Sequence, residues 1–303
     1  MTRPGALPAN DGLPDETELR ARHALANSVF AQVDGVDLHY VDEGSGPAVF
    51  LLHGSYASLH QWDDWSTALR QDYRIVRLDW PAFGLSGPDP AGDYTCERKL
   101  ALILALAERL HIKRFVVVGT SSAGVPAAAL AANYPDRVSA LILNKVAAGP
   151  LQHDHPLPPE VLHEIEQDAL HPGRHAPSFW RAILHMHYAK PERLSQETVD
   201  RWTELNNRRF APEVTPDPLA AEAEFARTPA DLARVTCPTL LLWSDQDHEV
   251  PIEREGQMAL HALGCIDKEL RIVPNCGHMA PDECGLDMLR VAMPFLERVT
   301  EPA

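Results

Sequence analysis

The feature that most constrains the fold is the alternation of short apolar runs with segments of helical spacing. The runs are PAVFLLHG, YRIVRLDW, FVVVG, VSALILN, PTLLLW and LRIVP, and the first and third end at a glycine. Between them, Leu100, Ile103, Leu104 and Ala107 follow helical spacing after Thr95, and residues 123–134 also have a helical pattern. Apolar strands separated by helices are typical of a mostly parallel sheet covered on both faces. We therefore predict an α/β fold with helices on both faces of the sheet.

The alternation is preceded by a tail and a hairpin, and it is interrupted once. Residues 1–27 begin with a stretch rich in proline, glycine and acidic residues, and we assign them to an N-terminal tail. The next segment alternates around Asp34-Gly35, a turn pair typical of a β-hairpin. Helical stretches without a convincing strand then occupy the region from about Gly149 to Pro229. We predict a core formed by residues 28–149 and 230–303, with a helical cap at 150–229.

Composition narrows the classes of partner. Apolar residues make up 45% of the 303 residues, which is enough for a sizeable core. The net charge of −16 argues against nucleic acids and anionic membranes, because both are negative. The chain shows no signal-peptide pattern and no apolar run of the length of a membrane span. We expect a cytoplasmic protein that acts on a small molecule without nucleic-acid or membrane partners, and homo-oligomer formation is left open.

The cysteines and histidines indicate neither a disulfide framework nor a metal centre. The five cysteines have no C-x-x-C spacing, so we expect a chain suited to a reducing compartment, without a zinc ribbon. The cap segment contains seven histidines, but His185 and His187 are two positions apart and would point in different directions on a helix. We expect these histidines to be solvated or hydrogen-bonded, and we predict no metal ion.

One turn between a strand and a helix presents hydroxyl groups. It reads Gly119-Thr120-Ser121-Ser122-Ala123-Gly124, with small residues two positions before and two after Ser121. This spacing is typical of a sharp turn that exposes a serine beside the N-terminus of a helix. An ordinary turn whose hydroxyls cap the helix is the alternative reading. Ser122 lacks the same spacing, so Ser121 is the candidate nucleophile.

A serine nucleophile needs a base, and two later loops supply candidates. His278 follows the run LRIVP and lies beside a glycine. The loop after LLLW offers Asp245, Asp247 and Glu249 as the carboxylate that would orient the imidazole. The order serine, acid, histidine is one of the known orders of such a triad.

The oxyanion hole and the substrate walls have further candidates. We assign the two oxyanion donors to the backbone N–H groups of Ser55, which follows His53-Gly54, and Ser122. Trp180 and Trp202 lie in predicted helices of the cap and are candidate substrate-binding residues. Packing of the cap onto the core is the alternative role, and we expect one of the two tryptophans to touch substrate.

Five segments together resemble the α/β-hydrolase family in its capped form. HGSYAS is similar to the family's oxyanion loop, LDWPAFGLSGP to its D-x-P-G-x-G-x-S-x-x-P loop, and GTSSAG to its nucleophile elbow. LLWSDQDHEVP and PNCGHMAPDE are similar to its acid and histidine loops. The resemblance runs from about Val29 to Leu296 and selects Asp247, four positions before Pro251, as the acid. Ala82 and Ala123 stand where the family often has glycine.

This resemblance implies a serine hydrolase that needs no cofactor. A serine at the elbow, where related dehalogenases and epoxide hydrolases have aspartate, implies acyl transfer to water from an ester or a lactone. A carbon–carbon bond hydrolase of a vinylogous 1,5-diketone is the alternative, and a ligand receptor without turnover is a third reading. The segment from Pro150 to Ala230 has thirteen acidic and eight basic residues, which favours a neutral substrate over an anionic one.

Overall fold

The computed structural model describes residues 13–149, 156–171, 174–207 and 224–301. Within them an eight-stranded sheet has the order β1-β2-β4-β3-β5-β6-β7-β8. The first two strands form the predicted hairpin and are antiparallel, as are β2 and β4, whereas all other neighbours are parallel. The strands are β1 (Ser28–Val33), β2 (Val36–Gly44), β3 (Ala48–Leu52), β4 (Arg74–Leu78), β5 (Phe115–Thr120), β6 (Val138–Asn144), β7 (Thr239–Ser244) and β8 (Lys268–Val273). The predicted α/β fold is confirmed.

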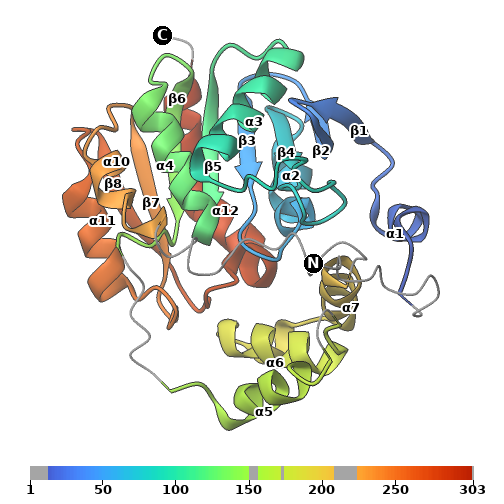
Figure 1. Cartoon of the computed structure of the whole chain (residues 1–303). Helices are drawn as coiled ribbons and strands as arrows, with labels where there is room; N and C mark the ends of the chain where they lie inside the picture. Colours follow the sequence, from blue (N-terminus) through green and yellow to red (C-terminus); the bar gives the residue numbers. More distant parts are fainter. Residues whose placement is uncertain (1–12, 150–155, 172–173, 208–223, 302–303) are drawn as a thin grey trace.

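Helices cover both faces of the sheet because the side chains of each strand alternate between two buried clusters (Figure 1). In β5, Val117 joins one cluster while Val116 and Val118 join the other. The helices of the first face are α3 (Cys96–Arg109), α4 (Gly124–Asn133), α10 (Thr228–Leu232) and α11 (Gln257–Ala262). Those of the second face are α2 (Asp63–Leu69) and α12 (Ala280–Thr300).

A short helix lies within the segment that the sequence assigns to a tail. This is α1 (Glu16–His23), and its first turn is closed by a capping box between Asp15 and Glu18. Arg22 and His23 at its end both bind Glu204, at 2.7 Å each. Local capping and contacts with a distant helix therefore order residues 16–23 of the polar segment that the sequence assigns to the tail. Residues 1–12 of the predicted tail lie outside the described residues.

Three of the helices between β6 and β7 gather on one side of the core (Figure 1). They are α5 (Pro159–Asp168), α6 (Pro177–His187) and α7 (Gln196–Asn206), with a short 3₁₀ turn, η3 (Pro191–Arg193), before α7. The proposed division of the chain assigns them to the cap, and its residues 150–155, 172–173 and 208–223 lie outside the described part. In the described ranges no helix combines the length and apolarity needed to cross a membrane.

Candidate active site

The parallel strands bring the candidate residues to one edge of the sheet. Ser121 directly follows β5 and Lys145 directly follows β6, while Asp247 and His278 lie in the loops after β7 and β8. These strands are neighbours and run in the same direction, so their carboxyl ends meet at this edge. Ligands of open parallel sheets bind at such an edge.

The turn that carries Ser121 is sharp and closely packed. Ser121 has a φ of 52°, in the left-handed region, and a 3₁₀ turn (η2, Ser121–Ala123) leads into α4. A Cβ on Gly119 would lie 2.5 Å from the carbonyl oxygen of Ala123, and one on Gly124 would lie 2.7 Å from the Val146 side chain. Small residues are therefore required around this serine. Its strained backbone is typical of functional sites.

A chain of hydrogen bonds links the three predicted catalytic residues. The Ser121 hydroxyl lies 3.0 Å from His278 Nε2, and His278 Nδ1 lies 2.9 Å from an Asp247 carboxylate oxygen. Since a carboxylate only accepts, Nδ1–H donates to Asp247 and leaves Nε2 free to accept the serine proton. Asp245 lies apart from this chain and accepts a bond from the Cys276 backbone N–H at 3.4 Å.

The Asp247 carboxylate is held in its ionised form. Its second oxygen accepts the backbone N–H groups of Glu249 and Val250, at 2.9 Å each. Burial opposes ionisation, but the charges of His278 and Lys145 and these hydrogen bonds outweigh it and hold the pKa of Asp247 below its usual value. Such a carboxylate can orient the imidazole and stabilise the imidazolium.

The loop after β3 brings backbone close to the candidate nucleophile. A Cβ on Gly54 would lie 3.4 Å from the Ser121 side chain, and the Gly54 N–H donates to Gln61 at 3.0 Å. Buried His53 fixes the loop by binding the Gly54 carbonyl at 2.7 Å and accepting the Trp80 N–H at 3.0 Å. The two predicted oxyanion donors are neighbours, because the Ser55 hydroxyl donates to the Ser122 hydroxyl at 2.9 Å.

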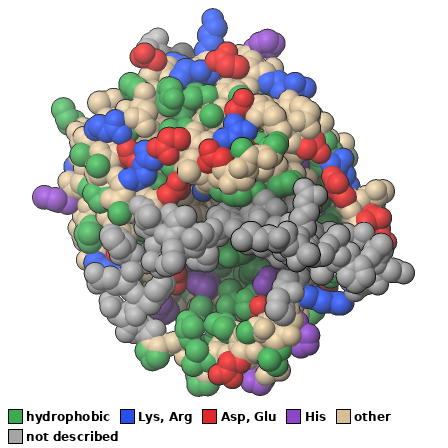
Figure 2. Space-filling view, in the orientation of Figure 1, with side chains coloured by type: hydrophobic (Ala, Val, Ile, Leu, Met, Phe, Trp, Pro, Cys, Tyr) green, Lys and Arg blue, Asp and Glu red, His purple; other side chains and the backbone are tan. Residues whose placement is uncertain are grey.

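A cavity of about 400 Å³ lies in front of Ser121 and His278, between the core and the cap helices. Its volume suits a small organic molecule. Figure 2 shows hydrophobic side chains and histidines around a hollow on this side of the molecule. Ser55 and Ser122 also border the cavity, and its described apolar walls are mostly aromatic and aliphatic: Tyr56, Phe83, Trp180, Ile183, Leu184, Trp202, Phe225 and Met279.

Both candidate tryptophans border this cavity and also pack in the cap. The rings of Trp180 and Trp202 lie 5.2 Å apart, and Tyr56 packs against Trp180 at 5.6 Å. The two roles considered for these residues are therefore compatible in the structure. Whether each touches substrate stays a prediction.

A histidine of the cap and a glutamate of the acid loop add charge to the apolar cavity. The ring of His187 lies 5.5 Å from that of His278, and His187 Nε2 lies 3.5 Å from Glu249. Burial disfavours the charged form, but the bonds to Glu249 and to the Ile183 carbonyl raise the pKa of His187 above its usual value. Within the described ranges no cluster of His, Cys, Asp and Glu could hold a metal ion.

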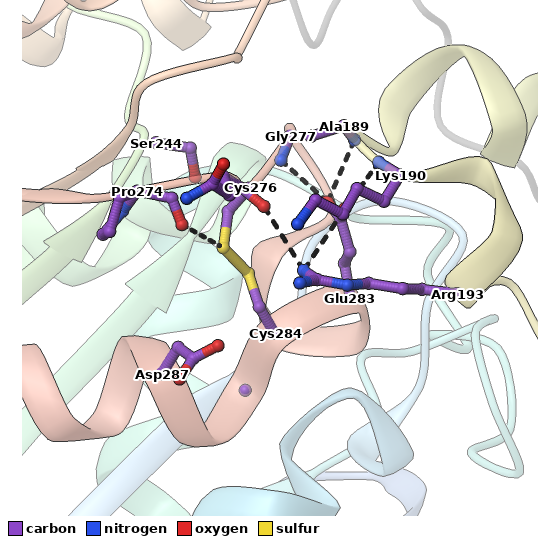
Figure 3. The surroundings of a disulfide bond; sticks show 12 residues. Ala189, Lys190, Arg193, Ser244, Pro274, Cys276, Gly277, Glu283, Cys284 and Asp287 are labelled. Atoms are coloured by element: carbon purple, nitrogen blue, oxygen red, sulfur yellow. Dashed lines mark hydrogen bonds and ion pairs between the residues drawn. A yellow bond between two sulfur atoms is a disulfide. The ribbon is translucent and has the colours of Figure 1, made fainter.

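A disulfide brackets the loop that carries His278. It joins Cys276 and Cys284, whose Cα atoms lie 6.4 Å apart (Figure 3). The sequence predicts no disulfide framework and does not indicate this bond, because the turn from β8 into α12 brings together two residues that share no spacing motif. The described Cys96, Cys237 and Cys265 are free and buried.

A buried carboxylate connects the same loop to the cap. Glu283 accepts backbone N–H groups from Gly277 at 2.7 Å, Lys190 at 2.8 Å and Ala189 at 3.1 Å, and Arg193 lies 3.7 Å away (Figure 3). Gly277 directly precedes His278, while Ala189 and Lys190 follow α6. Glu283 thus fixes the position of the histidine loop relative to the end of a cap helix.

Sequence reasoning missed several of these residues. The sequence indicates His187 only as one of the cap histidines and assigns no role to Lys145 or Glu283. One signal was present for Lys145, because a charged residue that directly follows an apolar strand lies at the carboxyl edge of the sheet. Glu283 and Cys284 carry no comparable signal, since their roles depend on where the chain returns.

Comparison with known proteins gives the same fold. The family model for the alpha/beta hydrolase fold matches residues 47–283. The chain is similar to 2-hydroxy-6-oxononadienedioate/2-hydroxy-6-oxononatrienedioate hydrolase of Burkholderia vietnamiensis (strain G4 / LMG 22486), with 24% identity over 93% of this chain and 99% of that protein.

Two solved structures are similar in fold. A meta-cleavage product hydrolase from Pseudomonas fluorescens IP01 has a TM-score of 0.74 and 21% identity, covering 90% of this chain and 98% of that one. A thermophilic esterase from Thermogutta terrifontis has a TM-score of 0.71 and 25% identity, covering 91% of this chain and 100% of that one. The family model spans most of the chain and includes the segments from the oxyanion loop to His278. The chain belongs to the alpha/beta hydrolase fold family.

Proposed function

We propose that the chain is a serine hydrolase in which Ser121 attacks a carbonyl carbon of a small substrate. The observation that carries the proposal is the hydrogen-bond chain from Ser121 through His278 to Asp247, which opens on a cavity of about 400 Å³. His278 takes the serine proton, and Asp247 stabilises the resulting imidazolium. The backbone N–H groups of Ser55 and Ser122 are the proposed donors to the oxyanion.

The reaction proceeds in two halves. When the tetrahedral intermediate collapses, the bond to the leaving group breaks and His278 returns the proton to that group. Water then attacks the acyl-enzyme while His278 accepts its proton, and release of a carboxylic acid restores the Ser121 hydroxyl. No step requires a metal ion or an organic cofactor.

The first proposed substrate class is a vinylogous 1,5-diketone of the 2-hydroxy-6-oxo-dienoate type, cleaved at a carbon–carbon bond. The names of the related proteins support it over the ester predicted from the sequence, because 2-hydroxy-6-oxo-dienoate hydrolases recur among them at 24–27% identity. The substrate would react as its 2-oxo tautomer, in which the 2-hydroxyl proton has moved to C5. Cleavage of the C5–C6 bond then leaves a carbanion conjugated with the 2-oxo-enoate, and His278 protonates this leaving group. His187, with its raised pKa, is the proposed contact of the substrate carboxylate.

A neutral carboxylic ester is the second candidate, and the cavity walls favour it. The described wall residues include no arginine or lysine, and Glu249 adds a negative charge beside His187. A substrate with two carboxylates would therefore meet little positive charge at this surface. The similarity to the Thermogutta terrifontis esterase points in the same direction.

A panel of two substrate classes tests the proposal. Purified protein would be assayed with 2-hydroxy-6-oxo-6-phenylhexa-2,4-dienoate and with a neutral p-nitrophenyl ester, in parallel with the Ser121→Ala variant. The first proposal predicts the higher kcat/KM for the dienoate, whereas a higher value for the ester selects the second. Absence of turnover with both, together with no reaction with a fluorophosphonate, would contradict the proposed function.

The cytoplasmic location stays a prediction, and the Cys276–Cys284 disulfide counts against a reducing compartment.

A further inference from the structure

We propose that Lys145 is a positioning residue for the proposed reaction: its buried ammonium group ties the acid-bearing strand end to the base-bearing loop and supplies the positive charge behind Asp247. The inference rests on the proposed function. Lys145 does not line the cavity of about 400 Å³ and so acts through Asp247 and His278 and not by touching substrate.

The backbone at Lys145 is held in an unfavourable conformation. Its φ is 55°, in the left-handed region. This conformation is sterically unfavourable for lysine, which has a Cβ, but not for glycine. The side chain is fully buried, with 0% exposed surface. Strained non-glycine residues persist where the surrounding structure fixes them, and they cluster at functional sites.

The contacts of the ammonium group join two strand ends. Nζ donates to the Ser244 hydroxyl at 3.2 Å and to the Gly277 carbonyl at 3.3 Å. Ser244 is the last residue of β7 and lies three positions before Asp247, while Gly277 directly precedes His278. Lys145 therefore connects the segment that carries the acid with the segment that carries the base.

The charges around Lys145 come from these loops and from α12. Asp247 faces it from the loop after β7, and Asp282 and Glu283 face it from the start of α12. The hydrogen-bond partners of Nζ, the Ser244 hydroxyl and the Gly277 carbonyl, are both uncharged. Burial lowers the pKa of Lys145 from 10.5 to about 8, against the raising effect of the three carboxylates.

The Lys145 ammonium affects the charge balance of the proposed pair Asp247 and His278. With Lys145 protonated, Asp247 is ionised and its charge is shared between the ammonium and the imidazole. Removing the ammonium leaves Asp247 with the imidazole alone, so His278 takes up a proton more easily. If His278 takes up a proton at a higher pH, the enzyme loses activity at a higher pH when the solution is acidified. The acidic limb of the pH–rate profile therefore moves to higher pH.

Three variants separate the contributions of charge and hydrogen bonding. Lys145→Met removes both, Lys145→Gln keeps donors without the charge, and Ser244→Ala removes one hydrogen-bond partner while the charge remains. The readout is the rate at which a neutral fluorophosphonate modifies Ser121 between pH 5 and 9, which requires no knowledge of the substrate. Histidine NMR titration gives a second readout without any reaction, with His187 identified by its loss in the His187→Gln variant.

We expect the acidic limb to move upward by about half to one pH unit in Lys145→Met and in Lys145→Gln. The plateau rate should fall about tenfold in Lys145→Met and less in Lys145→Gln, an effect of about 1.4 kcal/mol. The limb should be unchanged in Ser244→Ala, with a plateau within about threefold of wild type.

An unchanged limb and an unchanged His278 titration in both Lys145 variants would overturn the inference. Failure of wild-type protein to react with the fluorophosphonate would instead count against the proposed function, while the NMR titration would still test the role of Lys145. If Lys145→Met does not fold, Lys145→Gln alone decides the charge contribution.

Discussion

The described residues contain two hydrogen-bonded chains of serine, histidine and aspartate, and one of them lines the cavity of about 400 Å³. In the second, the Ser28 hydroxyl lies 2.7 Å from His39 Nε2, and His39 Nδ1 lies 2.6 Å from Asp79. These distances are as short as those that join Ser121, His278 and Asp247. Hydrogen-bond distances alone therefore do not distinguish a catalytic triad from a structural one.

The surroundings of Ser28 and Ser121 differ in the features that a nucleophile requires. The Ser28 hydroxyl accepts the Leu25 backbone N–H at 2.9 Å, and the His39 ring is stacked on Phe30 at 4.7 Å. None of Ser28, His39 and Asp79 lines the cavity of about 400 Å³, whereas Ser121 and His278 both do. A nucleophile needs space for a substrate and donors for the oxyanion, and the proposed donors Ser55 and Ser122 line the same cavity as Ser121.

The second chain has a structural role at the D-x-P loop. Asp79 accepts the backbone N–H groups of Leu59 and Leu85, at 2.6 Å each, in addition to His39. Ala82 in the same loop has a φ of 68°, so alanine occupies the conformation for which the family commonly uses glycine. The Asp79 network fixes this strained loop, whose Trp80 and Phe83 rings pack against His53 of the oxyanion loop.

The largest difference between the two chains is expected from removal of the serines. Ser121→Ala should reduce turnover by about 10⁶-fold, because the nucleophile is lost. Ser28→Ala should leave kcat/KM within about twofold and cost about 1 kcal/mol of stability, the usual contribution of one hydrogen bond. Steady-state kinetics and urea denaturation measure both. Comparable losses of activity in the two variants would make the chains equivalent and refute the distinction.

Neutralising the acid should have the next largest effect. Asp247→Asn should lower kcat about 10⁴-fold, since the amide no longer holds the imidazole in the required tautomer. Asp245→Asn is the matched control in the same loop, and its activity should stay within about threefold of wild type because Asp245 binds only a backbone N–H. Both variants would be assayed at the pH optimum, with circular dichroism to confirm folding. A large loss of kcat in Asp245→Asn with near-normal kcat in Asp247→Asn would contradict the assignment of the acid.

Neutralising Asp79 should affect stability and not catalysis. Asp79→Asn leaves a buried network short of an acceptor and should cost about 3–5 kcal/mol in the free energy of unfolding. The kcat of the folded fraction should remain within about threefold of wild type. A large loss of kcat with normal stability would show that the second chain takes part in catalysis.

The pH dependence of this stability has a defined sign. Burial opposes ionisation of Asp79, but His39 and the backbone donors hold its pKa well below the usual value. A depressed folded-state pKa gives stability that is complete above the unfolded pKa of about 4 and is lost as the pH falls further. The advantage of wild type over Asp79→Asn should therefore shrink on acidification below about pH 4.

The smallest effect is expected from Lys145, where stability and activity should move in opposite directions. Its folded-state pKa of about 8 lies below the unfolded value of 10.5, so the folded state binds the proton less tightly. Wild type should be less stable than Lys145→Met by about 3 kcal/mol at pH 7. This gap should narrow as the pH rises through 8 toward 10, as measured by urea denaturation. A gap that stays constant over this range would contradict the burial of a charged amine.

The sequence predicted the features that depend on local pattern. The parallel strands follow from their apolar runs, and α3 begins after Thr95, whose hydroxyl accepts the Arg98 N–H at 3.3 Å as an N-cap should. The turn that carries Ser121 was recognisable because only small residues fit around it. Each of these signals lies within a few consecutive residues.

The missed features depend on contacts between distant segments. Lys145 and Gly277 are 132 positions apart, and Glu283 binds Lys190 across 93 positions. The second serine–histidine–aspartate chain joins β1, β2 and the residue after β4, and no sequence motif predicts these contacts. Such contacts are set by how the elements pack, which local periodicity does not specify.

The central claim, that Ser121 alone among these serines is an activated nucleophile, is tested most directly by mapping the site of covalent modification. The folded protein would be treated with a fluorophosphonate, digested and sequenced by mass spectrometry. We predict that the phosphonyl group is found on Ser121, and that neither Ser28 nor Ser122 is modified. Modification of Ser28 or Ser122 in place of Ser121, or no modification of folded protein at any serine, would contradict the account.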